Sequence, residues 1–295
     1  MARYRCIMEY DGESYSGFQI QPNAVTIQEV TEKALSVLFG CDTKIIASGR
    51  TDSGVSAKAQ VIHFDAQTDI PDNKIPYCLQ QILPDDISIL TCDKANDDFH
   101  ARFDAKAKTY SYKILLTNIN RPLYKKYYQY PYKINIDLLY QALDKIKGTH
   151  NFKAFMSSGS DITNFERTIY DISHIGNKDC ITIKITANGF LYNMVRIIIG
   201  TSLDIARGKL DISVLDKMFE TGDRSFGGST APAHPLTLEE VFYWYTKSFY
   251  CLLCIFNLIK LSIWNKISTY YMSFLRINLS KKWLFKANWK KFLKN

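Results

Sequence analysis

Short stretches of the chain alternate between apolar and polar side chains. In residues 3–10 every second side chain is a tyrosine, cysteine or methionine, and tyrosine, isoleucine and leucine alternate in the same way in residues 109–116. A period of two residues is typical of a β-strand with one buried face. Further strands are predicted at residues 44–47, 60–64, 87–92, 167–175, 180–187 and 238–245.

Helical patterns separate these strands. Thr26 and Glu29 stand three residues apart, as in a capping box, and Gly40 follows the last apolar position, so a helix is predicted between Thr26 and Gly40. A second amphipathic helix is predicted at residues 138–147, ended by Gly148, with a flexible segment from residue 149 to 160. Other helices are predicted at residues 75–83, 191–206 and 212–220.

The order of these elements defines the expected fold class. Hairpins are frequent and crossover helices are few, which favours an α+β fold of two similar halves, each a largely antiparallel sheet with helices on one face, as in RRM or ferredoxin-like domains. The predicted boundary lies near residues 105–106, which gives domains 1–105 and 106–247. No glycine- or serine-rich linker marks the boundary, so we expect the two sheets to join.

A polar loop lies between the predicted strands 44–47 and 60–64. Gly49 and Gly54 bracket an arginine, a threonine and Asp52. Because glycine adopts positive φ and allows another backbone to approach, the loop is expected to be tight and to display Asp52 at its tip. Local composition alone would favour an ordinary turn, because aspartate and serine side chains bond to nearby backbone groups.

Charge and cysteine content bear on RNA binding, cellular location and metal binding. The net charge is +8, but residues 248–295 carry nine basic side chains and no acid, which leaves a net charge of −1 for the first 247 residues. An RNA-binding face on the body of the protein must therefore come from local clustering of arginine and lysine. Seven scattered cysteines favour free thiols and a cytoplasmic location. Cys251 and Cys254 lack a second ligand pair, so no metal is expected.

Seven blocks of sequence, in order, resemble the tRNA pseudouridine synthase A family. The most specific block is Gly49-Arg50-Thr51-Asp52. The blocks lie at residues 10–21, 49–64, 98–103, 110–112, 167–169, 190–200 and 230–238.

Four positions depart from the family pattern. Phe18 stands where the family usually has tryptophan, Ser53 and Ser56 replace alanine and histidine, and Pro235 replaces glycine. The change at Ser56 is expected to weaken an RNA contact without affecting the nucleophile.

The resemblance implies the pseudouridine synthase fold and an isomerase activity. Such an enzyme converts uridine to pseudouridine at positions 38–40 of the tRNA anticodon stem-loop. It uses no cofactor and no metal, and it acts as a homodimer with tRNA bound across both subunits.

The same resemblance implies roles for five residues. Asp52 would be the nucleophile, Arg196 its ionic partner, and Arg50 the group that fills the space left by the flipped base. Tyr110 would stack on the uracil, and Leu236 would form an apolar wall. Each has a simpler alternative: Arg196 as a helix residue reaching solvent, Arg50 as a phosphate contact, and Tyr110 and Leu236 as core residues. The nearby His100 is expected to be a structural, hydrogen-bonded residue.

Residues 248–295 have no counterpart in the family. This basic and aromatic tail suits an interfacial helix, an RNA-contacting arm or unselected sequence. We favour the third and expect no membrane contact through the tail.

Two rival functions remain for the whole chain. One is a non-catalytic RNA-binding protein with RRM-like platforms, and the other is a membrane-attached protein of unrelated function. Asp52 discriminates against the first, because a carboxylate directed at a polyanion adds nothing to binding alone.

Overall fold

The computed structural model describes residues 1–159, 162–177 and 179–243. The interpretations of the tail at 248–295 lie outside the described residues. Among the helices of the described residues, none has the length and apolar content needed to cross a membrane.

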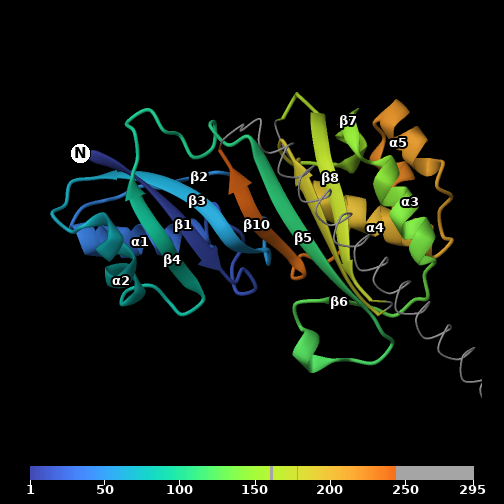
Figure 1. Cartoon of the computed structure of the whole chain (residues 1–295), viewed down its shortest axis with the longest axis horizontal. Coiled ribbons are helices and arrows are strands. Elements are labelled where there is room, and N and C mark those ends of the chain that lie inside the picture. The colour runs from blue at the N-terminus through green and yellow to red at the C-terminus, as the bar shows by residue number, and fades with distance from the viewer. Residues whose placement is uncertain (160–161, 178, 244–295) are drawn as a thin grey trace, which may run out of the picture. The chain divides into compact units, whose positions relative to one another are not determined.

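One ten-stranded sheet runs through the described chain, in the order β4-β1-β3-β10-β5-β9-β8-β7, with β2 paired to β3 and β6 to β5 (Figure 1). Only the β10–β3 and β5–β6 pairs within this described sheet are parallel. The predicted α+β fold with a largely antiparallel sheet is therefore confirmed. The strands are β1 (Ala2–Tyr10), β2 (Ile46–Ala47), β3 (Ser56–Ala66), β4 (Ile87–Lys94), β5 (Ala107–Leu116), β6 (Tyr128–Tyr130), β7 (Gly148–Asn151), β8 (Glu166–Gly176), β9 (Cys180–Ala187) and β10 (Leu236–Phe242).

The last strand, β10, joins the two parts of the sheet. Thr237 pairs with Ser56 of β3, and Leu236 pairs with Tyr112 of β5. The two sheets are therefore continuous, as expected. The residues from Met1 to Tyr243 form one compact unit, and the division near residue 105 stays a prediction.

Five helices accompany the sheet in the described residues: α1 (Ile27–Phe39), α2 (Ile75–Gln80), α3 (Ile136–Lys145), α4 (Met194–Ala206) and α5 (Val214–Thr221). Helix α1 begins and ends as predicted. Thr26 Oγ1 accepts a hydrogen bond from Glu29 N at 3.3 Å, and Gly40 closes the helix in the left-handed conformation, with φ +70°. The Glu29 carboxylate does not complete the capping box, because it accepts from Lys33 Nζ at 2.6 Å.

The sequence interpretation was wrong around α3. The helix begins two residues earlier than predicted, because the Asn135 side chain caps it by accepting from Leu138 N at 3.1 Å. Gly148 does not end the helix; it is the first residue of β7. The start of the supposed flexible segment is this edge strand, where Thr149 and Thr168 hydroxyls meet at 2.8 Å across the β7–β8 pair.

The cysteines also differ from expectation. Cys6 of β1 and Cys92 of β4 lie directly opposite each other, with their Cα atoms 4.1 Å apart, and form a disulfide. Cys41, Cys78 and Cys180 are free. Only the antiparallel register of two strands far apart in sequence brings the first pair together, so sequence spacing did not reveal it.

His63 is a buried histidine beneath the loop that connects β4 to β5. Its side chain is 3% exposed, and Nδ1 accepts a hydrogen bond from Ala101 N at 3.1 Å. Burial first, and then the charges of Arg3 and His100, lower the pKa of His63 to about 4, against the opposing effect of Asp65 and Asp104. The folded protein therefore holds this imidazole neutral.

This shift predicts a pH-dependent stability. Below pH about 6.5 the unfolded chain takes up a proton at His63, whereas the folded chain does so only near pH 4. The free energy of unfolding should thus fall as pH drops, by about 2 kcal/mol at pH 5 from this residue alone. Denaturant unfolding at pH 7 and pH 5 measures it. In His63→Asn, whose amide oxygen can replace the Nδ1 acceptor, this component should vanish; an unchanged pH dependence in the variant would contradict the assignment.

Candidate active site

The predicted polar loop joins β2 to β3. Ser48 N donates to Val61 O at 2.7 Å where the loop leaves β2, and Val55 N donates to Asp52 O at 3.1 Å where the loop turns into β3. Gly54 has φ +79°, a backbone conformation that a side chain would strain. The tight loop with Asp52 near its tip is confirmed.

A second loop, residues 12–18, packs against the first. Phe18 N donates to Thr51 O at 3.1 Å, and Ser53 Oγ donates to Tyr15 O at 3.2 Å. Gly17 has φ +89°, and a Cβ there would lie 2.9 Å from Thr51 O. Glycine is therefore required at residue 17 both for backbone conformation and for close approach.

Buried polar side chains form the floor under the loop. Tyr10 Oη and Thr51 Oγ1 are 2.8 Å apart. Gln60 Nε2 donates to Gly49 O at 2.8 Å, and Ser48 Oγ donates to Gln60 Oε1 at 2.6 Å. Sequence reasoning missed Gln60, although a glutamine among the apolar residues of a predicted strand is a signal that it could have used.

Lys108 of β5 supports the start of the loop. Its Nζ donates to Ser48 O at 2.6 Å, and a Cβ on Gly49 would lie 2.4 Å from that nitrogen. Burial, with a smaller contribution from Arg102, lowers the pKa of Lys108 to about 8. The second half of the sheet thus contacts the loop through this lysine.

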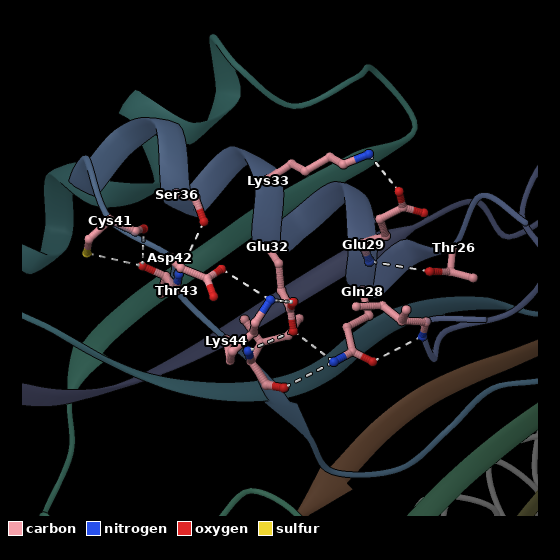
Figure 2. A network of polar contacts seen from close by, with 12 residues as sticks. Thr26, Gln28, Glu29, Glu32, Lys33, Ser36, Cys41, Asp42, Thr43 and Lys44 are labelled. Atoms are coloured by element: carbon pink, nitrogen blue, oxygen red, sulfur yellow. Dashed lines mark hydrogen bonds and ion pairs between the residues drawn. The ribbon is translucent and has the colours of Figure 1, made fainter. Parts of the chain in front are cut away.

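Helix α1 fixes the chain on the approach to the loop (Figure 2). The buried Glu32 carboxylate accepts from Ile45 N at 3.1 Å and from Gln28 Nε2 at 2.8 Å, and it lies 3.2 Å from Lys44 Nζ. The same Gln28 accepts from Ile20 N at 3.2 Å. One helix therefore holds the segment before β2 and the segment after Phe18.

The structure brings Asp52 and Arg196 together. Arg196 Nη1 lies 3.8 Å from Asp52 Oδ2, and the two side chains are 19% and 22% exposed. Burial raises the pKa of the Asp52 carboxyl, and the Arg196 guanidinium opposes that rise. Asp52 is therefore partly buried, which corrects the expectation of a fully displayed carboxylate that ionises without help.

Arg196 is held in place from two sides. Its Nε donates to Ala231 O at 2.7 Å, and its Nη1 donates to Asn193 Oδ1 at 2.6 Å. The guanidinium is directed into the site, so the alternative of a helix residue reaching solvent is wrong.

Tyr110 and Leu236 lie on the neighbouring strands. Tyr110 is 8% exposed, and its ring meets Phe190 edge-to-face at 5.1 Å between centroids. Burial raises the pKa of the Tyr110 phenol well above its usual value, and Tyr10 and Asp52 raise it further. Leu236 is buried at the start of β10.

Arg50 contrasts with these residues. Its side chain is exposed, and within the described part of the chain its guanidinium makes no hydrogen bond or ion pair. It stands two residues before Asp52, free to meet a ligand.

His100 is structural, as expected. Its Nδ1 accepts from Arg102 N and Phe103 N, each at 3.2 Å.

Two of the departures from the family pattern are accommodated locally. Phe18 is 3% exposed and packs against Tyr10 at 6.1 Å between ring centroids. Ser56 Oγ accepts from Gly12 N at 3.2 Å and donates to Asp11 Oδ1 at 3.3 Å, so Ser56 stabilises the base of the loop pair.

Comparison with known proteins identifies the family of the chain. The sequence profile of a family described as tRNA pseudouridine synthase matches residues 6–104 and 142–244. The chain belongs to the tRNA pseudouridine synthase family. A tRNA pseudouridine synthase A of Thermoanaerobacter sp. (strain X514) is 42% identical over 244 residues, which cover 82% of this chain and 100% of the relative. That of Bacillus subtilis (strain 168) is 42% identical over 245 residues, 82% of this chain and 99% of the relative.

The site of this synthase therefore has three supports outside the sequence blocks, Gln28, Glu32 and Lys108. A fourth, Asn193, lies within the block at residues 190–200. Within the described residues, no three histidine, cysteine, aspartate or glutamate side chains gather in a way that could hold a metal ion.

The close approach at Gly17 gives a prediction. Gly17→Ala should lower pseudouridine formation more than tenfold, because the new Cβ would push Thr51 and displace Asp52. Gly40→Ala is the matched control. Gly40 also has positive φ, +70°, but nothing lies within 4 Å of its Cβ position, so that variant should lose only about 1 kcal/mol of stability and keep its activity. Turnover and thermal unfolding of both variants measure this; equal activity loss in the two would show that close approach is not the reason.

Proposed function

We propose that this chain isomerises uridine to pseudouridine at positions 38–40 of the tRNA anticodon stem-loop, with Asp52 as nucleophile. The observation that carries the proposal is the pairing of Asp52, on a rigid glycine-bracketed loop, with Arg196 at 3.8 Å. Membership of the tRNA pseudouridine synthase family supports tRNA as the substrate.

The reaction makes one bond and breaks another without a net change in composition. The C1′–N1 bond breaks, the uracil turns, and C1′ bonds to C5, after which C5 loses its proton and N1 carries one. Asp52 acts as a nucleophile, on the sugar carbon or on the base ring, and both routes require an ionised carboxylate beside the nucleoside. No cofactor or metal takes part in either route.

Arg196 keeps Asp52 ionised in a partly dry site. Burial favours the neutral acid, and bound RNA would exclude more water and strengthen that effect. A guanidinium close by favours the carboxylate and opposes it. Arg196 is therefore the residue that lets a buried aspartate serve as nucleophile at neutral pH.

Tyr110, Leu236 and Arg50 complete the site. With its raised pKa, the Tyr110 phenol stays protonated at neutral pH, so it stacks on the uracil and does not serve as a base. Leu236 provides an apolar wall. The exposed Arg50 occupies the space left in the RNA stack when the target nucleotide swings out.

The active form is proposed to be a homodimer with tRNA bound across both subunits, in line with the family resemblance.

A non-catalytic RNA-binding protein is the alternative. The partly buried Asp52 disfavours this alternative, because a carboxylate repels the phosphates of RNA and adds nothing to binding alone.

The nucleophile gives the next prediction. Asp52→Asn keeps the size of the side chain but removes the charge, so pseudouridine formation should be abolished while tRNA affinity remains. Nucleoside mass spectrometry of tRNA anticodon fragments from a deletion strain carrying the variant measures the product, and filter binding measures affinity.

Asp85→Asn, at an exposed position, is the control and should behave as wild type. Product formation by Asp52→Asn would overturn the choice of nucleophile. A wild-type protein that binds tRNA without modifying it would favour the RNA-binding alternative.

The role of Arg50 can be separated from a phosphate contact. Flipping a paired base costs a few kcal/mol, and less at a mismatch. Arg50→Ala should therefore slow modification of a base-paired target uridine about tenfold or more, and slow a mismatched target much less. Single-turnover rates on the two RNAs measure this. Equal slowing on both would instead assign Arg50 to the phosphate backbone.

A further inference from the structure

Asn193, immediately before α4, has an unusual backbone conformation. Its φ of 60° and ψ of 8° are left-handed. Among the described residues other than glycine, Asn23 and Asn193 alone have positive φ. Such residues cost free energy and persist where the surrounding structure requires them, often at functional sites.

The Asn193 side chain does not cap its own helix, although asparagine at this position commonly does so. Instead its Oδ1 accepts from Arg196 Nη1 at 2.6 Å, and its Nδ2 donates to Ser157 Oγ at 2.9 Å. Asn193 and Arg196 are three residues apart and therefore lie on the same side of the helix start. The amide thus links the arginine, through its oxygen, to a distant segment, through its nitrogen.

The guanidinium orientation follows from these contacts. A guanidinium is planar and rigid, so two hydrogen bonds to different nitrogens fix its plane. Ala231 O holds Nε at 2.7 Å, and Asn193 Oδ1 holds Nη1, the same nitrogen that lies 3.8 Å from Asp52 Oδ2. Without Asn193, only one of these two hydrogen bonds would remain, that from Nε to Ala231 O, and the group could rotate about it.

We propose that Asn193 is a positioning residue that aims the Arg196 guanidinium at Asp52, and that its left-handed backbone is retained because this geometry needs it. The inference rests on the proposed function, in which Asp52 is the nucleophile. Asparagine suits both the backbone conformation and the contact with Arg196. It tolerates positive φ better than most residues with side chains, and its short side chain places the amide oxygen next to Nη1.

Loss of Asn193 should alter the acidity of Asp52. Arg196 on α4 is the cation that faces the carboxylate, Tyr110 faces it from β5 as a neutral phenol, and Arg50 precedes it on its own exposed loop. If Arg196 rotates away, its charge no longer counteracts the effect of burial on Asp52, and the pKa of Asp52 rises. A smaller fraction of the enzyme then carries the ionised nucleophile at a given pH.

The test is Asn193→Gly, which removes the amide but accepts positive φ without strain. We expect the single-turnover rate at saturating tRNA to fall about tenfold, the acidic limb of the pH–rate profile to move to higher pH, and tRNA affinity to stay near wild type. Asn23→Gly is the matched control. Asn23 has φ 59°, so this substitution relaxes the same backbone conformation elsewhere and should leave rate and profile unchanged.

A double variant separates positioning from general support of the fold. If Asn193 acts through Arg196, then Asn193→Gly combined with Arg196→Met should be no slower than Arg196→Met alone. The proposal would be overturned if the rate losses of the two single variants multiplied in the double variant. It would also be overturned if the acidic limb of the pH–rate profile of Asn193→Gly did not move.

A measurement that does not depend on catalysis tests the positioning role of Asn193 separately from the proposed function. Carboxyl NMR titration of Asp52 should give a higher pKa in Asn193→Gly than in wild type, whether or not the protein makes pseudouridine. A raised Asp52 pKa with an inactive wild type would contradict the proposed function and leave the positioning role supported. An unchanged pKa in an active enzyme would overturn the positioning role alone.

Discussion

The ionic approach of Arg196 to Asp52 is the interaction on which the site depends. The carboxylate lies on a loop from the first part of the sheet, and the guanidinium comes from a helix in the second part, 3.8 Å away. Neither part holds both groups. Because β10 pairs with β3 on one side and β5 on the other, the sheet is continuous at the point where the two groups meet. In the proposed mechanism, the joined sheet is therefore needed for the chemistry as well as for packing.

Much of the fold could be predicted because its signals are local. Thr26 and Gly40 delimit α1 through contacts within one turn of the helix, and alternating residues mark the longer strands. The errors occur where distant contacts decide. β7 is an edge strand with the polar sequence Gly-Thr-His-Asn, so it has no apolar alternation, and its order comes from pairing with β8. The Cys6–Cys92 pair likewise depends on register between β1 and β4, which no spacing along the chain encodes.

The candidate site divides in the same way. The position of Asp52 between two glycines was visible in the sequence, since a tight polar loop has a local signature. The groups that hold the loop and its partner were not. Gln60 supports the loop from inside β3, and Asn193 fell at a variable position of a recognised block. Gln60 offered a signal, since a glutamine among apolar strand residues is unusual, but its acceptor at Gly49 is near only in the folded chain. Asn193 contacts the nearby Arg196 and the distant Ser157, and its sequence position alone indicated neither contact.

Lys108 shows why the support of the loop has this composition. A buried ammonium is normally paired with a carboxylate, yet the acceptor for Lys108 Nζ is the neutral carbonyl of Ser48. Burial then lowers its pKa to about 8, so at neutral pH the charged form persists at a cost to stability. A carboxylate partner would offset part of that cost but would place another negative charge beside the loop proposed to receive RNA. Lys108 and Asn193 thus hold the two sides of the proposed site with uncharged partners: Lys108 donates to Ser48 O, and Asn193 accepts from Arg196. Neither contact adds a second carboxylate beside Asp52.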